Sequence, residues 1–187
     1  ITTYRSDSYD GSSHKPDVAF GDSLEADLER RDFTMNAMAL TLPGLQLVDP
    51  FGGLEDLLAL SLTTPVAPEV SFDDDPLRMM RAARFSSQLS ARIAPATAEA
   101  MTAMASRIAD ISAERVRDEL VKILSSADPR PGLEALVDSG IAEFVLPELP
   151  ALRLETDEHA HHKDVYQHTL TVVEQAIDEE QRRTPGA

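Results

Sequence analysis

Three arginines recur at every third position in the segment SFDDDPLRMMRAARF, residues 71–85, directly after three aspartates and a proline. On a helix, a step of three residues turns by about −60°, so Arg78, Arg81 and Arg84 fall on one ridge. A planar guanidinium fits a phosphate or the edge of a base, and a carboxylate accepts hydrogen bonds from amino groups. The spacing therefore predicts a helix that carries either a row of ion pairs or a set of base- and phosphate-binding groups.

The chain as a whole is acidic, with 33 Asp and Glu against 17 Lys and Arg and a net charge of −16 over 187 residues. This excess argues against a broad phosphate-binding surface, so any contact with nucleic acid must be local. No run approaches 18 apolar residues and no signal peptide is recognisable, so we expect no membrane partner. Cysteine is absent, which excludes disulfides and favours a cytoplasmic setting.

Hydrophobic periodicity predicts an α+β chain in which a small piece of sheet precedes mostly helices. Strands are expected at 1–5 and 17–20, a polar loop at 6–16, and a β-hairpin within 33–48 that turns at Pro43 and Gly44. Helices are expected at 23–30, 53–60, 76–88, 95–109, 112–126, 131–139 and 162–180. In the helix at 76–88, Asp75 is the expected N-cap, and Met79, Met80 and Ala83 are expected to pack inward, opposite the arginines.

Three sequence blocks stand in order along the chain: DLERRDFTMNAMAL at 27–40, VDPFGGLEDL at 48–57 and DDPLRMMRAARF at 74–85. In this order and at this spacing they resemble the bacterial-type (class II) tRNA nucleotidyltransferases and their poly(A) polymerase relatives. The segments ISAERVRDELVKIL and GLEALVDSGIAEFVLPEL resemble the helical neck and body of that family. The resemblance implies transfer of nucleotides from CTP and ATP to an RNA 3′ end, with C, C and A placed on tRNA by the CCA-adding members.

The resemblance also implies a division of the chain into three parts. Residues 1–62 would form the C-terminal part of a polymerase-β-like nucleotidyltransferase head. Residues 63–150 would form an all-α neck and body with RNA- and nucleotide-binding helices. Residues 151–187 would begin an HD-like helical region in which His168 is the first metal ligand, but the later ligands of an HD site are not in the chain, so no metal residue is predicted.

The nucleotide-binding residues follow from the same resemblance. Asp75 and Arg78 match the pair that reads the incoming base, and Arg31 matches an arginine that contacts the nucleotide. Arg81 and Arg84 match arginines that lie near the triphosphate or build its pocket.

Three further residues of these blocks have matching positions in the family. Asp74 stands where the family usually has glutamate and is counted with the nucleotide-binding residues. Asp32 and Asn36 match other positions of the RRDFT block and receive supporting roles only.

Base recognition by a carboxylate and a guanidinium is chemically consistent with this assignment. Cytosine and adenine each present an amino donor beside a ring-nitrogen acceptor, which Asp75 and Arg78 could bind. Uracil and guanine present groups of the opposite sense, which would leave buried polar atoms unpaired at roughly 1–3 kcal/mol each. The protein would then select the base without a nucleic-acid template.

Transfer in this family requires two Mg²⁺ ions, which are held by a DxD pair after a Gly-Gly-x-x-Arg-Asp stretch. The chain contains no such stretch, so no catalytic residue is assigned, the ligands are expected in a preceding segment, and the chain alone is expected to be inactive. The aspartates at 73–75 could form a metal cluster, but base reading and helix capping are the favoured roles of Asp75. Three alternatives stay open: a poly(A) polymerase, a regulatory protein that binds nucleotide or RNA without catalysis, and an HD-type phosphohydrolase.

Overall fold

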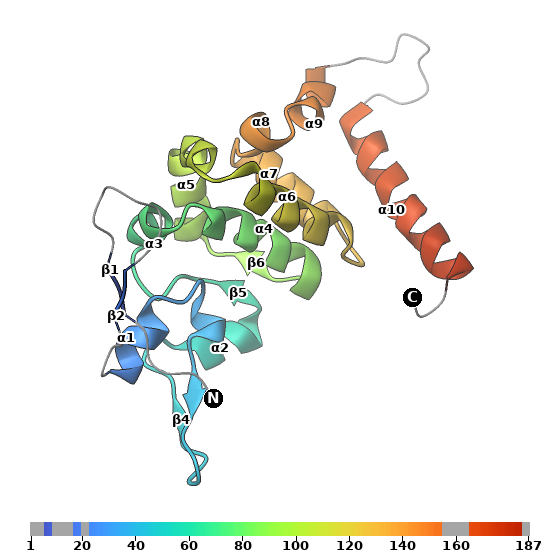
Figure 1. Cartoon of the computed structure of the whole chain (residues 1–187). Coiled ribbons are helices and arrows are strands. Elements are labelled where there is room, and N and C mark those ends of the chain that lie inside the picture. The colour runs from blue at the N-terminus through green and yellow to red at the C-terminus, as the bar shows by residue number, and fades with distance from the viewer. Residues whose placement is uncertain (1–5, 9–16, 20–22, 155–164, 185–187) are drawn as a thin grey trace.

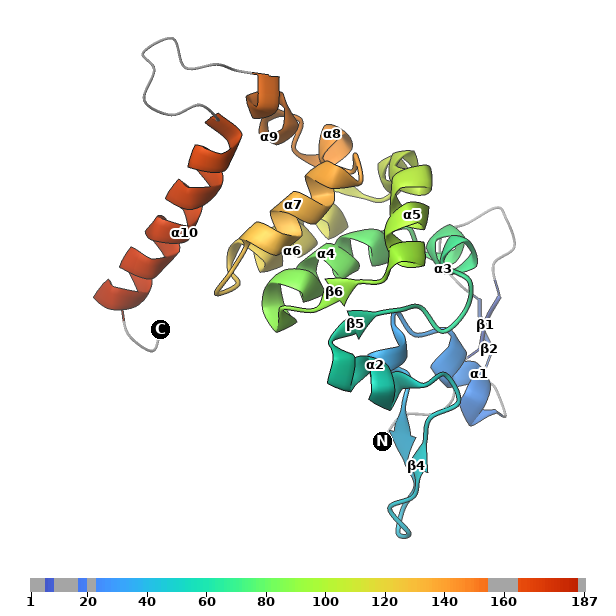
Figure 2. The same ribbon diagram turned by 180° about the vertical axis from the view of Figure 1, so that it is seen from behind.

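The structure is a computed structural model that describes residues 6–8, 17–19, 23–154 and 165–184. Short strands and helices from the N-terminal third lie at one end, an array of helices occupies the middle, and the long C-terminal helix runs beside this array (Figures 1 and 2). The α+β class predicted from the sequence is confirmed.

The N-terminal part contains two antiparallel strand pairs, β1 with β2 and β3 with β4, together with short helices. Its elements are β1 (Ser6–Ser8), β2 (Asp17–Ala19), α1 (Leu24–Glu29), the 3₁₀ helix η1 (Thr34–Asn36), β3 (Ala39–Leu40), β4 (Leu47–Val48) and α2 (Gly53–Ala59).

Most of the predicted N-terminal elements are present, with two corrections. The loop predicted at 6–16 is wrong at residues 6–8, which form β1, and the strand predicted at 1–5 lies outside the described residues. The hairpin is shorter than predicted, because residues 34–36 form a 3₁₀ turn that is closed by a hydrogen bond from the Phe33 amide to Asn36 Oδ1 at 3.2 Å. Phe33 and Met35 are buried, and they reach the core from this turn and not from a strand.

The rest of the described chain is mainly helical. Its helices are α3 (Pro68–Asp74), α4 (Leu77–Leu89), α5 (Pro95–Met104), η2 (Ala105–Asp110), α6 (Ala113–Leu124), α7 (Arg130–Asp138), α8 (Ala142–Val145), α9 (Glu148–Ala151), η3 (Leu152–Leu154) and α10 (Val165–Arg183). The longer helices agree with the prediction, whereas α3 and the short turns α8, α9 and η3 were not predicted. Among the described residues, no helix combines the length and apolar character needed to cross a bilayer.

A short parallel strand pair joins the two parts of the molecule. β5 (Ser61–Leu62) pairs with β6 (Arg92–Ile93), so that α3 and α4 form the connection between them. The pair brings both ends of the α3–α4 segment back to the N-terminal part, and it therefore fixes where the arginine ridge lies relative to residues 27–36.

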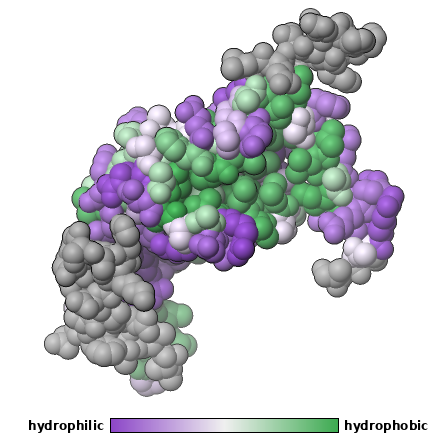
Figure 3. All heavy atoms as spheres, turned by 45° about the horizontal axis from the view of Figure 1, so that its top comes forward, coloured by the Kyte–Doolittle hydropathy of each residue, from purple (hydrophilic) through white to green (hydrophobic). Residues whose placement is uncertain are grey.

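The apolar side of α4 anchors it in the middle of the helical part. Met79, Met80 and Ala83 are fully buried, as predicted, and α4 packs against α6 and α7. In a space-filling view, hydrophobic residues gather over the middle of the helical part, while the end of α10 near the C-terminus is hydrophilic (Figure 3). Because the opposite side of α4 is anchored in this core, its arginine ridge has a fixed direction.

The crossing of α4 and α7 depends on a glycine. Ser87 Oγ on α4 accepts a hydrogen bond from the Gly132 amide at 2.9 Å and donates to the Pro129 carbonyl at 3.2 Å. A Cβ atom at Gly132 would lie 2.4 Å from Ser87 Oγ and 2.7 Å from the Ala83 carbonyl oxygen. The two helices therefore approach more closely than any other residue at position 132 allows.

We expect Gly132→Ala to lower the free energy of unfolding by about 1–3 kcal/mol, because this overpacking outweighs the roughly 1 kcal/mol that alanine adds to helix propensity. Urea denaturation followed by circular dichroism measures the change. Gly44→Ala is the matched control, since the nearest atom to its Cβ would be Gln46 Cγ at 3.9 Å. Equal stability of Gly132→Ala and wild type would contradict the inferred close approach.

Candidate functional site

The start of the arginine ridge lies at a sharp turn between α3 and α4. Asp75 has extended backbone geometry as the C-cap of α3, and Pro76 occupies the N-cap position of α4. The prediction that Asp75 is the N-cap of α4 is therefore wrong by one residue: α3 extends to Asp74, Asp75 is its C-cap, and Pro76 is the N-cap of α4. The Asp75 carboxylate still supports the start of α4, since its Oδ1 accepts a hydrogen bond from the Leu77 amide at 3.3 Å.

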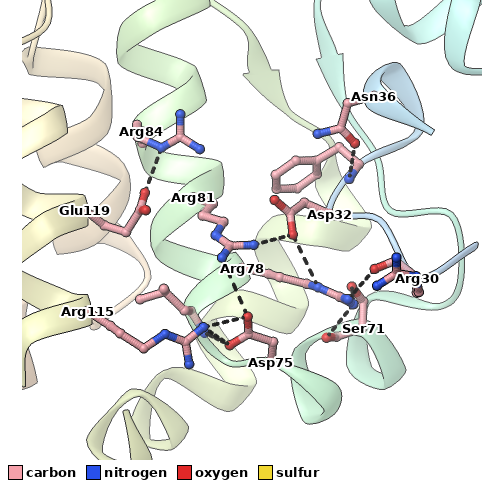
Figure 4. A network of polar contacts seen from close by, with 12 residues as sticks. Arg30, Asp32, Asn36, Ser71, Asp75, Arg78, Arg81, Arg84, Arg115 and Glu119 are labelled. Atoms are coloured by element: carbon pink, nitrogen blue, oxygen red, sulfur yellow. Dashed lines mark hydrogen bonds and ion pairs between the residues drawn. The ribbon is translucent and has the colours of Figure 1, made fainter. Parts of the chain in front are cut away.

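Asp32 binds two arginines of the ridge from the segment that follows α1. Arg81 Nη1 donates to Asp32 Oδ1 at 2.6 Å, and Arg78 Nε lies 3.5 Å from the same oxygen. Figure 4 shows Asp32 between these two guanidinium groups. The supporting residue of the RRDFT block thus couples the N-terminal part to α4.

Asp75 has a similar position between Arg81 and an arginine of α6. Arg115 Nη2 donates to Asp75 Oδ2 at 3.0 Å and to Oδ1 at 3.2 Å, while Arg81 Nη2 lies 3.9 Å from Oδ2 (Figure 4). The five residues Arg78, Asp32, Arg81, Asp75 and Arg115 alternate in charge and form what we call the ion-pair chain. It connects the N-terminal part, the α3–α4 turn and α6.

Arg78 is the buried member of the ion-pair chain, with 7% of the residue exposed. Its Nη1 donates to the carbonyl oxygen and hydroxyl of Ser71 at 3.1 and 2.9 Å, and its Nη2 donates to the Arg30 carbonyl oxygen at 2.5 Å. A guanidinium has five N–H donors, so two of them make no hydrogen bond to the described residues, and one of the two is on Nε. Arg78 is thus held firmly and keeps some donor capacity.

Arg84 points to a different neighbour. Its Nε donates to Glu119 Oε2 on α6 at 2.7 Å, its Nη1 donates to Gln88 at 2.8 Å, and its guanidinium lies 4.0 Å from the centre of the Phe85 ring. Arg84 therefore joins α4 to α6 and is not brought together with Asp75 and Arg78. This geometry fits the predicted role of building the site better than direct contact with phosphate.

Arg31 lies beside the ion-pair chain without joining it. Its Nη2 donates to Asp27 Oδ2 at 3.1 Å, its Nη1 lies 3.5 Å from the Asn36 carbonyl oxygen, and 43% of its side chain is exposed. Its chain neighbours contact Arg78 through the Arg30 carbonyl and the Asp32 carboxylate, whereas the Arg31 guanidinium itself contacts Asp27 and Asn36.

The described residues do not form a magnesium site. In the described ranges, no group of three or more His, Asp or Glu side chains is placed to hold a metal ion. The aspartate triplet does not converge, since Asp73 pairs with Arg107 and Asp75 with Arg115, and Asp74 lies exposed at the end of α3. His168 lies on α10, and the other histidines of the predicted HD opening are outside the described residues.

The VDPFGG block has a structural explanation. Asp49 accepts hydrogen bonds from the Gly53 and Leu54 amides at 2.6 and 2.9 Å, which caps α2. Gly52 has a φ of +71°, and a Cβ on Gly53 would lie 2.1 Å from the Thr34 carbonyl oxygen. The two glycines permit the turn and the close approach of η1, and the Asp49 carboxylate already occupies the amides that could have bound a phosphate.

Burial and ion pairing have opposite effects on the charged groups of the ridge. Burial lowers the pKa of Arg81, but the nearby carboxylates of Asp32 and Asp75 raise it, and the net pKa lies above the ordinary value of an arginine. Burial likewise raises the pKa of Glu119, but hydrogen bonds from Lys122 and Arg84 lower it below the ordinary value of 4.5. Both groups are therefore charged at neutral pH.

Comparison with known proteins identifies the family. Residues 1–62 match a family model described as the poly A polymerase head domain, and residues 92–152 match one described as the probable RNA and SrmB-binding site of polymerase A. The CCA-adding enzyme of Levilactobacillus brevis is 42% identical over 144 residues, which cover 76% of this chain and 36% of that protein. This chain belongs to the bacterial-type family of tRNA nucleotidyltransferases and poly(A) polymerases.

Solved structures of family members agree with the fold. A crystal structure of the Bacillus stearothermophilus CCA-adding enzyme in complex with CTP is 41% identical, with a TM-score of 0.67, and covers 75% of this chain and 33% of that one. The Thermotoga maritima CCA-adding enzyme complexed with tRNA(CCA) is 25% identical, with a TM-score of 0.62, and covers 88% of this chain and 45% of that one. The chain spans 36% to 42% of the length of the curated relatives that it matches.

Sequence reasoning missed two residues of α6 that complete the network. Arg115 and Glu119 are four positions apart, so they lie on one face of the helix, and they bind Asp75 and Arg84 respectively. The four-residue spacing of Arg115 and Glu119 can be seen in ISAERVRDELVKIL, but the same spacing is equally typical of two residues that form an ion pair with each other on one helix. Only the fold shows that both side chains face α4 instead.

We expect Glu119→Gln to be less stable than wild type by about 1.5–3 kcal/mol at neutral pH, because it weakens a charged hydrogen bond to Arg84 and leaves that cation uncompensated. The folded pKa of Glu119 is lowered, so its contribution is complete above about pH 4.5 and is lost as the pH falls through the folded value. The difference between variant and wild type should therefore shrink on acidification. Urea titrations from pH 7 to pH 3 measure it, and a difference independent of pH would contradict the assignment.

Proposed function

We propose that this protein, in its full length, is a CCA-adding enzyme that transfers nucleotides from CTP and ATP to the 3′ end of tRNA without a nucleic-acid template. The main support is the ion-pair chain at the start of α4, which brings Asp75 and Arg78, the residues expected to read the base, close to Arg81, which is expected to lie near the phosphates. The names of the relatives point the same way, since those matched at about 40% identity are CCA-adding enzymes.

Base selection in this proposal rests on Asp75 and Arg78. The Asp75 side chain is 17% exposed, and its Oδ2 accepts one short hydrogen bond, from Arg115, which leaves acceptor capacity for a base amino group. Arg78 would donate one of its two remaining N–H groups to the ring nitrogen. Because Arg78 is buried between Ser71 and Arg30, we propose that the base meets it at the mouth of the site and that its contacts adjust on binding.

The phosphates are assigned to the more exposed arginines. Arg81 has 27% of its side chain exposed, is paired with Asp32 and keeps its charge, and Arg31 has 43% of its side chain exposed. Arg84 and Asn36 hold the surrounding elements in place, and Asp74 adds negative charge at the end of α3. No transfer step is assigned to residues of this chain, because the Gly-Gly-x-x-Arg-Asp stretch and the DxD pair that follows it in the family are not among them.

The domain division expected from the sequence is retained in the proposal. Residues 1–62 form part of the head, residues 63–150 the neck and body, and residues 151–187 the beginning of an HD-like region. We further propose that the helices of the neck and body contact tRNA locally, since the net charge of −16 disfavours a broad RNA-binding surface.

An addition assay separates the remaining candidate functions. Full-length protein is incubated with a tRNA that lacks its last three nucleotides, together with CTP, ATP and Mg²⁺, and the products are resolved by length. A CCA-adding enzyme extends the tRNA by three nucleotides, and a poly(A) polymerase makes long products from ATP alone. Nucleotide binding without extension would instead favour the regulatory alternative.

We expect Asp75→Ala and Arg78→Lys to reduce the preference for CTP and ATP over UTP and GTP by about 5- to 150-fold, which corresponds to the roughly 1–3 kcal/mol of an unpaired polar group. Arg78→Lys keeps the charge but loses the planar fork. Titration of all four nucleotides against the full-length proteins measures the preference, after circular dichroism has confirmed that each variant is folded.

Arg81→Ala serves as the comparison for these variants. We expect it to weaken all four nucleotides by a similar factor, since it removes charge near the phosphates and not a base contact. Equal affinities for the four nucleotides in the wild type would contradict the assignment of the base-reading pair.

A further inference from the structure

Arg115 of α6 makes the shortest contacts to the Asp75 carboxylate. Its Nη2 lies 3.0 Å from Oδ2 and 3.2 Å from Oδ1, so a single nitrogen spans both oxygens. The remaining close donors are the Leu77 amide, 3.3 Å from Oδ1, and Arg81 Nη2, 3.9 Å from Oδ2. The Leu77 amide and Arg115 thus both hold Oδ1, and Arg115 makes the shortest contact to Oδ2.

The position of Arg115 is not explained by stability. It lies in the first turn of α6, which begins at Ala113, and a cation there is disfavoured by the helix dipole. Its side chain is 47% exposed, and such exposed ion pairs contribute little to folding. Arg115 therefore occupies an unfavourable helix position and yet has a specific partner on another element. We look for a functional reason for this pairing.

The alternative partner of Asp75 supplies that explanation. Without Arg115, the nearest cation to Asp75 Oδ2 is Arg81, which already donates to Asp32 at 2.6 Å. The Asp75 carboxylate would then turn toward Arg81, and the two groups would neutralise each other. The carboxylate would lose the orientation in which Oδ2 can accept from a base, and Arg81 would lose part of its attraction for phosphate.

We propose that Arg115 is a positioning residue for base selection, which acts by holding Asp75 apart from Arg81 and turned toward the incoming base. This inference rests on the proposed function, because it concerns the same base-reading carboxylate. Arg115 does not contact the base itself, so its removal alters the choice between nucleotides more than the affinity for the triphosphate.

The experiment compares wild type with Arg115→Ala and Arg115→Lys in the full-length protein. Values of kcat/KM are measured for CTP and for UTP on a tRNA that lacks its last three nucleotides. We expect Arg115→Ala to lower the CTP to UTP ratio about tenfold, mainly through loss of activity with CTP. Arg115→Lys, which restores a cation near Asp75, is expected to recover most of the ratio.

Arg117→Ala is the matched control. Arg117 lies two residues further along α6, is 68% exposed on its side chain and pairs with its neighbour Asp118, so the variant removes the same charge without touching Asp75. Its CTP to UTP ratio is expected to equal that of the wild type.

The possible outcomes separate this inference from the proposed function. A wild-type protein that adds no nucleotides, or that uses CTP and UTP equally, would overturn the proposed function. A wild type that discriminates, together with an Arg115→Ala variant that discriminates equally well or loses activity with both nucleotides alike, would overturn the role of Arg115 alone.

Discussion

The pairing of each ridge arginine with a carboxylate from another segment is the interaction on which this part of the molecule depends. Arg78 and Arg81 meet Asp32, Arg81 also approaches Asp75, and Arg84 meets Glu119. A guanidinium that leaves water is costly unless it is compensated, so helix α4 can pack here only if the other elements bring their acids to it. The charges thus impose a relative position on segments that the hydrophobic core alone would hold less specifically.

The two interpretations of the arginine ridge, a row of ion pairs and a ligand-binding surface, are compatible. Arg84 is engaged between α4 and α6, and Arg78 is largely buried, so these two have a clear structural role. Arg81 and Asp75 are partly exposed, and Arg31 more so. The same network can therefore fix the geometry with its buried members and present charge to a ligand with its outer ones.

The sequence predicted those features whose signals are local. The period of α4 placed Met79 and Met80 in the core and the arginines on the other side of the helix, and the ordered motif blocks indicated the family. Helix α3 was missed because two of its three acids, Asp73 and Asp74, stand at the C-terminal end, where the dipole disfavours them, and because it holds only seven residues. The β5–β6 pair is two residues long on each side and offers no periodicity to detect.

Features that depend on distant segments could not be predicted. The partner of Arg115 is 40 positions away along the chain, so no local pattern links it to Asp75. The burial of Arg78 could not be predicted for a different reason. Most of the groups that accept its hydrogen bonds are peptide carbonyls, which every residue possesses. Side-chain patterns in a sequence carry no information about such contacts.

The reliance of Arg78 on carbonyl oxygens has an evolutionary consequence. Any amino acid at position 30 supplies the same main-chain acceptor, so this position can vary without weakening the hold on the guanidinium, whereas position 71 also contributes the Ser71 hydroxyl, which accepts from Arg78 Nη1 at 2.9 Å. The arginine at position 78 cannot be replaced in the same way, because no other side chain offers several donors in one plane. Family members can accordingly differ in the residue at position 30 and keep the same contact between its carbonyl oxygen and the arginine.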